Sequence, residues 1–214
     1  ASGAVIESSL DKGRGYLASY ETKTNVELDG DLNNETSFTF SGFNEYDDYD
    51  YYANFYLFGN PFSFNMDWDN IVTTDLAEDG YAVVTADGSY GYKLDGEIAV
   101  GDGFFVKVIG ENPSLSYGPQ RSRRADKHYI DLVASSKYGS DNVIINFAGN
   151  NEEGFAKLEN FNKDIAEIYV KGEGRRYGIL SFEKDVEEID VYFEPNKMGE
   201  YTINAITEGE FQNV

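Results

Sequence analysis

The side chains best placed for metal chemistry stand in an acidic segment near the N-terminus, DGDLNNE. Oxygen-bearing residues occupy alternate positions there: Asp29, Asp31, Asn33 and Glu35. This spacing is typical of the start of a calcium loop, in which spaced oxygens surround a hard cation. The glycine and the closing glutamate of such a loop are missing from their usual places. A solvent-exposed hairpin is therefore the alternative, and the interpretation we prefer.

A second segment, NEYDDYDYY, mixes acids with tyrosines. Its carboxylates offer a further calcium site, formed by Asp47, Asp48 and Asp50. Its aromatic rings are Tyr46, Tyr49, Tyr51 and Tyr52. Tyrosine supplies rigid, amphipathic contact area, so this loop is a candidate surface for a sugar or a protein. A solvated loop with no ligand is the competing interpretation, and the one we prefer.

Two residue types occur only once, and each has a functional and a structural interpretation. Trp68, in FNMDWDNI, is a candidate to stack on a sugar ring, but a lone tryptophan more often anchors a loop to the core. We prefer the anchor. His128 is the sole histidine, which argues against a metal site built from several imidazoles. No G-x-S-x-G motif accompanies it, so a serine hydrolase is not indicated.

Paired carboxylates for glycoside hydrolysis are the remaining catalytic possibility. The most strand-like candidates lie along FEKDVEEIDVYFE: Glu183, Glu187, Glu188, Asp190 and Glu194. Such catalysis needs one acid and one base on either side of the bond. The density of these acids is typical of a charged solvent face, and no pair stands out. We therefore predict that the chain is not an enzyme.

The composition of the chain argues against several classes of partner and cofactor. The chain has 214 residues, with 39 acidic against 17 basic side chains and a net charge of −22. A nucleic-acid partner is not expected, because it requires a basic surface that releases counterions. No apolar run approaches the length of a membrane span, so no membrane insertion is expected. Without cysteine there are no disulfides or thiolate metal sites. No cofactor is predicted apart from the calcium alternative.

Alternation of apolar and polar residues predicts an all-β fold. Phe104, Val106 and Val108 share one parity, and similar patterns recur from residue 38 to residue 206. Glycine-containing turns such as Asp87-Gly88 and Asp95-Gly96 separate the segments. Short strands at this spacing favour an antiparallel β-sandwich or jelly roll. No segment predicts a long amphipathic helix.

A basic stretch divides the chain. Residues 118–127, GPQRSRRADK, hold four basic side chains in an otherwise acidic sequence. We interpret 119–125 as a linker between a first β unit, 1–118, and a second, Ig-like β-sandwich, 126–214. A patch for an anionic ligand or a processing site is the alternative.

Several motifs resemble one family. They are GRGYLA (13–18), FSG (40–42), FYLFGNPFSFNMDWDNI (55–71), VGDGFFVK (100–107), NEEGFAKLENFNKD (151–164) and GEYTINA (199–205). Together they resemble the β-rich regions that precede sorting domains in surface proteins of the Bacteroidetes exported by the type IX route. In such proteins a GNPYP…DW turn is followed by a G-x-GFFVK strand. Here Phe62 replaces the usual tyrosine.

The resemblance implies a secreted or cell-surface module, attached at the outer membrane, and it carries no catalytic residues. The sorting domain and the strand after GEYTINA are not found, so the chain is expected to be a fragment whose last sandwich strand is missing. The expected role is structural, adhesive or protein-binding. A carbohydrate-binding module and a glycan-active enzyme are the first and second alternatives. A surface glycan or a protein is the expected partner, and the sequence does not determine the oligomeric state.

Overall fold

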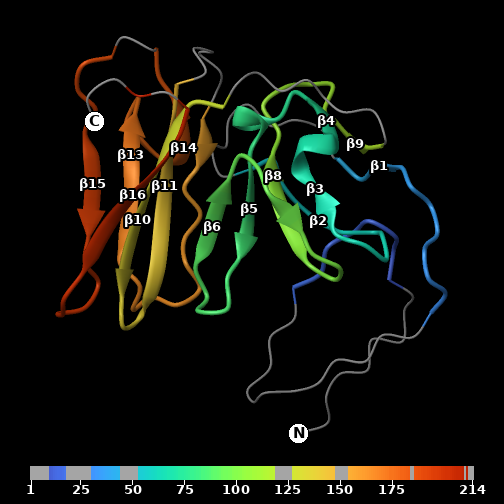
Figure 1. The fold of residues 1–214 in the computed structure, drawn as a ribbon, viewed down its shortest axis with the longest axis horizontal. Coiled ribbons are helices and arrows are strands. Elements are labelled where there is room, and N and C mark those ends of the chain that lie inside the picture. Colours follow the sequence, from blue (N-terminus) through green and yellow to red (C-terminus); the bar gives the residue numbers. More distant parts are fainter. Residues whose placement is uncertain are drawn as a thin grey trace, which may run out of the picture.

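The computed structural model describes residues 10–17, 30–43, 53–118, 127–147, 154–183, 186–209 and 211. This part of the chain is all-β, as predicted, and its helical turns are two short 3-10 segments, Trp68–Asn70 and Ala77–Asp79. None of its helices is long and apolar enough to cross a membrane. Figure 1 shows two β units side by side, the N-terminal unit in blue and green and the C-terminal unit in yellow to red.

In its described residues the first unit has nine short strands in three sheets. Its strands are β1 (Phe38–Phe40), β2 (Phe55–Gly59), β3 (Met66–Asp67), β4 (Ile71–Thr74), β5 (Tyr81–Val84), β6 (Tyr90–Lys93), β7 (Glu97–Ile98), β8 (Gly103–Lys107) and β9 (Ser114–Tyr117). The sheet orders are β1-β9-β4, β2-β8-β5-β6 and β3-β7, and every pair is antiparallel. These sheets enclose one aromatic core.

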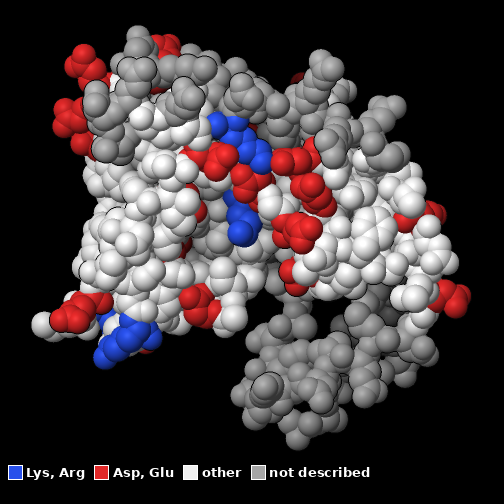
Figure 2. All heavy atoms as spheres, in the orientation of Figure 1, with Lys and Arg blue, Asp and Glu red and all other residues white. Residues whose placement is uncertain are grey.

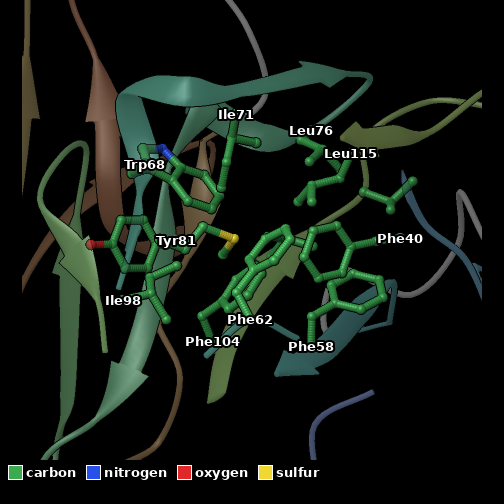
Figure 3. Close-up of a cluster of buried hydrophobic side chains, with 13 residues drawn as sticks. Phe40, Phe58, Phe62, Trp68, Ile71, Leu76, Tyr81, Ile98, Phe104 and Leu115 are labelled. Atoms are coloured by element: carbon green, nitrogen blue, oxygen red, sulfur yellow. The ribbon is translucent and has the colours of Figure 1, made fainter. Parts of the chain in front are cut away.

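Strand β8 shows how alternation builds that core. Phe104 and Val106 are both fully buried and face the cluster that contains Phe40 and Phe58 (Figure 3). Phe105, on the opposite face of the strand, packs instead against a second cluster at the junction with the C-terminal unit. Successive side chains of a strand point to opposite faces, so one strand serves two cores.

The second unit is a single seven-stranded sheet. Its strands are β10 (Tyr129–Ser136), β11 (Gly139–Asn146), β12 (Phe155–Ala156), β13 (Glu167–Gly172), β14 (Arg175–Ser181), β15 (Val191–Glu194) and β16 (Thr202–Glu208). The order is β15-β13-β14-β11-β10-β16, with β12 on β14. One pair, β11 with β14, is parallel, whereas the sequence predicted an antiparallel sandwich throughout. The segment between these two strands includes β12 and β13 and forms the crossover that a parallel pair requires.

The hairpin between β13 and β14 follows from local chemistry. Its two turn residues, Glu173 and Gly174, have φ angles of 50° and 78°. A two-residue loop of this kind requires left-handed backbone at both positions, because only that twist matches the flanking strands. Gly174 adopts it without steric cost, whereas Glu173 does not.

The two units share a core. Among the described strands, no sheet crosses the boundary expected near residue 118, and the expected linker 119–125 lies outside the described residues. The second apolar cluster nevertheless joins Tyr90 and Tyr92 of the first unit to Ile144, Phe155 and Ile179 of the second. The units are therefore packed together through buried side chains.

Candidate functional site

Two of the four residues predicted to begin a calcium loop, Asn33 and Glu35, make contacts within the protein. The Asn33 amide donates to the carbonyl of Pro61 at 2.7 Å and accepts the Glu35 N–H at 3.1 Å. The Glu35 carboxylate pairs with Lys12 at 2.5 Å, and Asp31 is exposed. Asp29 lies outside the described residues. Within the described ranges no three His, Cys, Asp or Glu side chains are grouped to hold a metal, so calcium binding stays a prediction.

The predicted recognition loop lies outside the described residues. This applies to its tyrosines, Tyr46, Tyr49, Tyr51 and Tyr52, and to its acids, Asp47, Asp48 and Asp50. Trp68 is placed: its ring is fully buried and lies 4.3 Å, centroid to centroid, from that of Tyr81 (Figure 3). Stacking on a sugar needs an accessible ring face, which Trp68 lacks. In this structure the residue is a core anchor.

The acids weighed for glycoside hydrolysis lie on the surface. All five are exposed: Glu183, Glu187, Glu188, Asp190 and Glu194. Glu194 accepts hydrogen bonds from Arg176 at 3.0 Å and from Tyr169 at 2.5 Å. These contacts tie neighbouring strands together. The interpretation as a charged solvent face fits this arrangement.

Polar side chains that the sequence did not single out join the two units. Asn142 of β11 accepts from the Tyr92 N–H at 2.9 Å and donates to the Tyr92 carbonyl at 3.0 Å. Its amide therefore completes the backbone hydrogen bonding of β6. Asp87 accepts from the N–H of Ser140 at 2.9 Å. Because β11 is bonded to the first unit at both Ser140 and Asn142, the orientation of the units is specified by directional contacts.

Glu78 is the third of these junction residues. It is buried, with a relative exposure of 7%, and its backbone has a left-handed φ of 56°. The carboxylate accepts from the Ser181 N–H at 2.8 Å, from the Ser181 hydroxyl, and from the Asn146 amide at 3.2 Å. Asn146 and Ser181 are register partners in the parallel pair of β11 and β14. Glu78 thus caps the end of that pair from the other unit.

A buried ion pair lies beside the junction. Lys157 Nζ is 2.7 Å from each carboxylate oxygen of Asp141, and the two side chains are 3% and 0% exposed. Burial raises the pKa of the Asp141 carboxyl, against the opposing effect of the Lys157 charge. Burial also lowers the pKa of Lys157, against the charge of Asp141. Both directions favour the uncharged forms of the pair.

The most open part of the structure is the outer edge of the second unit. Strand β16 pairs with β10 on one side and has no neighbour on the other among the described strands. All seven of its residues are exposed, including Ile203 at 52% and Ile206 at 57%. The connection from β15 to β16 adds Met198, which is 96% exposed. An edge of this kind offers unpaired backbone groups together with apolar side chains.

Charge is distributed unevenly over the surface. On the face drawn in Figure 2, basic side chains form small groups with acidic side chains close to them, and uncharged residues make up most of the described surface. Lys127 illustrates how a basic group is used: it lies 2.9 Å from Asp69 and 3.2 Å from Asp95. Such neutralised lysines do not provide the basic track that a phosphate backbone needs.

The site therefore has two parts, a polar junction in which buried charges are satisfied internally and a strand edge that none of the described strands covers. Comparison with known proteins gave no matching family model, no matching curated protein and no matching solved structure.

Proposed function

We propose that this chain is a non-catalytic module of a secreted or cell-surface protein, and that it binds another polypeptide by strand addition at β16. One observation carries the proposal: β16 is a seven-residue edge strand, exposed along its whole length, and among the described strands it has a partner on one side only. In strand addition the main chain supplies affinity, and alternating side chains supply specificity. The location at the cell surface rests on the sequence resemblance.

The edge lacks the usual devices that block such pairing. Natural edges carry lysines, prolines or bulges that discourage a second strand. β16 reads TINAITE, with a single charged residue, Glu208, at its end. Its seven pairs with β10 run from Tyr129 to Ser135 without a register shift. The unpaired side is therefore regular along its length and suited to receive an extended segment.

The net charge of the chain favours a basic partner at the β16 edge over a second copy of the chain. Two copies of the chain repel each other, because each has a net charge of −22. Glu200 precedes the strand, and Glu208 is its last residue. The occupant we infer is an extended segment of another protein with alternating β-branched residues and lysine or arginine at its ends. Steering by opposite charge would speed its association at low salt.

The non-catalytic part of the proposal is supported by how the described acids are used. The buried ones, Glu78 and Asp141, have their oxygens occupied by donors from neighbouring strands. The acids weighed for glycoside hydrolysis are exposed. Sugar binding by the loop tyrosines stays a prediction, and no observation in the described residues favours it.

The test uses a fluorescein-labelled peptide of alternating valine and threonine with a lysine at each end. We expect saturable binding by fluorescence anisotropy, together with slower hydrogen–deuterium exchange of the amides in 202–208. The variant Ile203→Lys with Ile206→Lys should bind more than roughly tenfold more weakly, because two charges would enter the new sheet surface. Its unfolding free energy should stay within about 0.5 kcal/mol of wild type, since both residues are exposed.

Val100→Lys is the matched control, because Val100 is 55% exposed but lies in the first unit, before β8. It should bind the peptide like wild type. Binding that survives the double lysine change, or that occurs without protection of β16, would contradict docking at this edge.

A further inference from the structure

We propose that Lys157 and Asp141 form a covalent amide bond within the folded chain, an intramolecular isopeptide cross-link between the loop after β12 and the start of β11. The observation that carries this is the contact already described, in which Nζ faces the whole carboxyl group at 2.7 Å from each oxygen. The inference is independent of the strand-addition proposal.

The reaction balances within the pair. A proton passes from the Lys157 ammonium to the Asp141 carboxylate, which leaves a neutral amine beside a neutral acid. The amine lone pair forms a bond to Cγ. Nitrogen then releases a second proton to the Oδ1 hydroxyl, the Cγ–Oδ1 bond breaks, and water leaves. One ammonium and one carboxylate become one amide and one water, with no oxidant, reductant or other reactant.

Neighbouring groups are placed to assist each stage. The Ile168 N–H donates to Oδ2 of Asp141 at 2.9 Å, where negative charge develops in the tetrahedral intermediate. The Asn142 carbonyl accepts from Lys157 Nζ at 2.9 Å and orients the amine. Holding the two reacting groups in contact replaces a collision with a positioned, unimolecular step.

Burial favours both formation and survival of the amide. Lys157 and Asp141 are almost fully enclosed, and the Lys157 ammonium lies 4.6 Å from the ring centroid of Tyr92. An apolar enclosure disfavours the charged pair and keeps out the water that would hydrolyse the product. The directions of the two pKa shifts, up for Asp141 and down for Lys157, agree with this environment.

The product needs no new hydrogen-bond partners. After condensation, the amide N–H still has the Asn142 carbonyl as its acceptor, and the amide oxygen still has the Ile168 N–H as its donor. A buried amide with both groups satisfied carries no desolvation penalty of the kind that a buried ion pair carries.

Mass spectrometry of the full chain tests the proposal. After incubation of the folded protein at neutral pH, we expect an intact mass lower than the sequence mass by one water. The sequence has no lysine or arginine between residues 137 and 157. Trypsin should therefore fail to cleave after the acylated Lys157 and should yield peptide 138–163 less one water, in place of 138–157 and 158–163.

A second digestion cuts the stretch of chain that the Lys157–Asp141 bond would close into a ring. Cleavage after Glu152 and Glu153, which lie between the two residues in the sequence, should leave the flanking segments joined as one species. Lys157→Met should restore the full mass, whereas water loss through a succinimide elsewhere would persist in that variant. This readout does not require the variant to fold as stably as wild type.

The exposed pair Lys163 and Glu159 is an internal control. Its N···O distance is 2.8 Å, but its side chains are 65% and 84% exposed. We expect normal cleavage after Lys163, because water competes at that site. Full intact mass together with free peptide 138–157 from the incubated wild-type protein would overturn the proposal.

Discussion

Replacement of Glu78 by alanine should weaken the whole molecule and should uncouple its two units. The side chain belongs to the first unit, yet its carboxylate holds the Ser181 N–H and hydroxyl and the Asn146 amide at the end of the β11–β14 pair. Alanine removes all three acceptor contacts and leaves the donors in a site that water does not reach freely.

The cost can be worked from these contacts. A hydrogen bond to a charged group contributes about 1.5–3 kcal/mol, and a buried donor that is left without its acceptor costs about 1–3 kcal/mol. The contacts are not additive, and Asn146 keeps its bond to the Ser181 hydroxyl at 3.0 Å. We therefore expect a loss of about 3 kcal/mol in the free energy of unfolding. For a chain of this size that corresponds to a fall of roughly 6–12 °C in melting temperature.

Urea unfolding followed by tryptophan fluorescence and by circular dichroism is the assay. Trp68 reports on the first unit alone, so uncoupling should separate the two transitions. Glu173→Ala is the control, because Glu173 has a similar left-handed φ of 50° but is exposed in the β13–β14 turn. It should change stability by less than about 0.5 kcal/mol. If Glu78→Ala lowers the free energy of unfolding as little as the control does, the role assigned to the Glu78 carboxylate is refuted.

Two further changes probe the junction. A Cβ added to Gly178 would lie 2.2 Å from the buried Tyr92 ring, so Gly178→Ala should lower the free energy of unfolding by about 1–3 kcal/mol, as measured by thermal unfolding. Gly91→Ala is the control and should be close to neutral, because the nearest contact of its Cβ would be 3.4 Å away. Equal effects of the two changes would refute the steric argument. Burial raises the pKa of Asp131, with the Asn142 amide opposing it. A carboxyl whose pKa is raised by folding contributes stability that is fully present below its unfolded pKa, near 3.9. This contribution is lost as the pH rises through the folded pKa. Asp131→Asn should therefore be more stable than wild type at pH 7 and equal to it in acid, as measured by urea midpoints across pH; a destabilised variant at pH 7 would contradict this.

Much of the fold could be predicted because its signals are local. Alternation at Phe104 and Val106 marks a strand wherever its partners lie, and the structure confirms one there. The preferred interpretation of Trp68 as an anchor also agrees with its burial, since a single large aromatic amid apolar neighbours usually enters a core. The alternating patterns at 129–134, 142–147, 167–170, 178–182, 189–193 and 201–206 predict strands, and they fall on β10, β11, β13, β14, β15 and β16.

The junction could not be predicted, because its contacts join residues far apart in the chain. Glu78 and Ser181 are separated by 103 residues, and nothing in the sequence around either marks them as partners. Glu78 is one of 39 acids, and Asp141 is another. Their special environments arise when the strands pack. The parallel pairing of β11 with β14 was missed for the same reason, since strand order is not encoded in the alternation of a single strand.

The strands of the second unit make fewer stabilising side-chain contacts from the centre of the sheet to its outer edge. Strand β11 is bonded to the first unit by Asn142 and Asn146, and Asp141 joins it to Lys157. Strand β10 shares the apolar core through Ala134, which is buried. Strand β16 has no buried side chain, so its ladder with β10 is the main contact that holds it. Opening free energies should therefore decrease from β11 to β16. A strand added beyond β16 would pair the backbone groups that are now open and cover Ile203 and Ile206, and so would support the sheet where its own contacts are fewest.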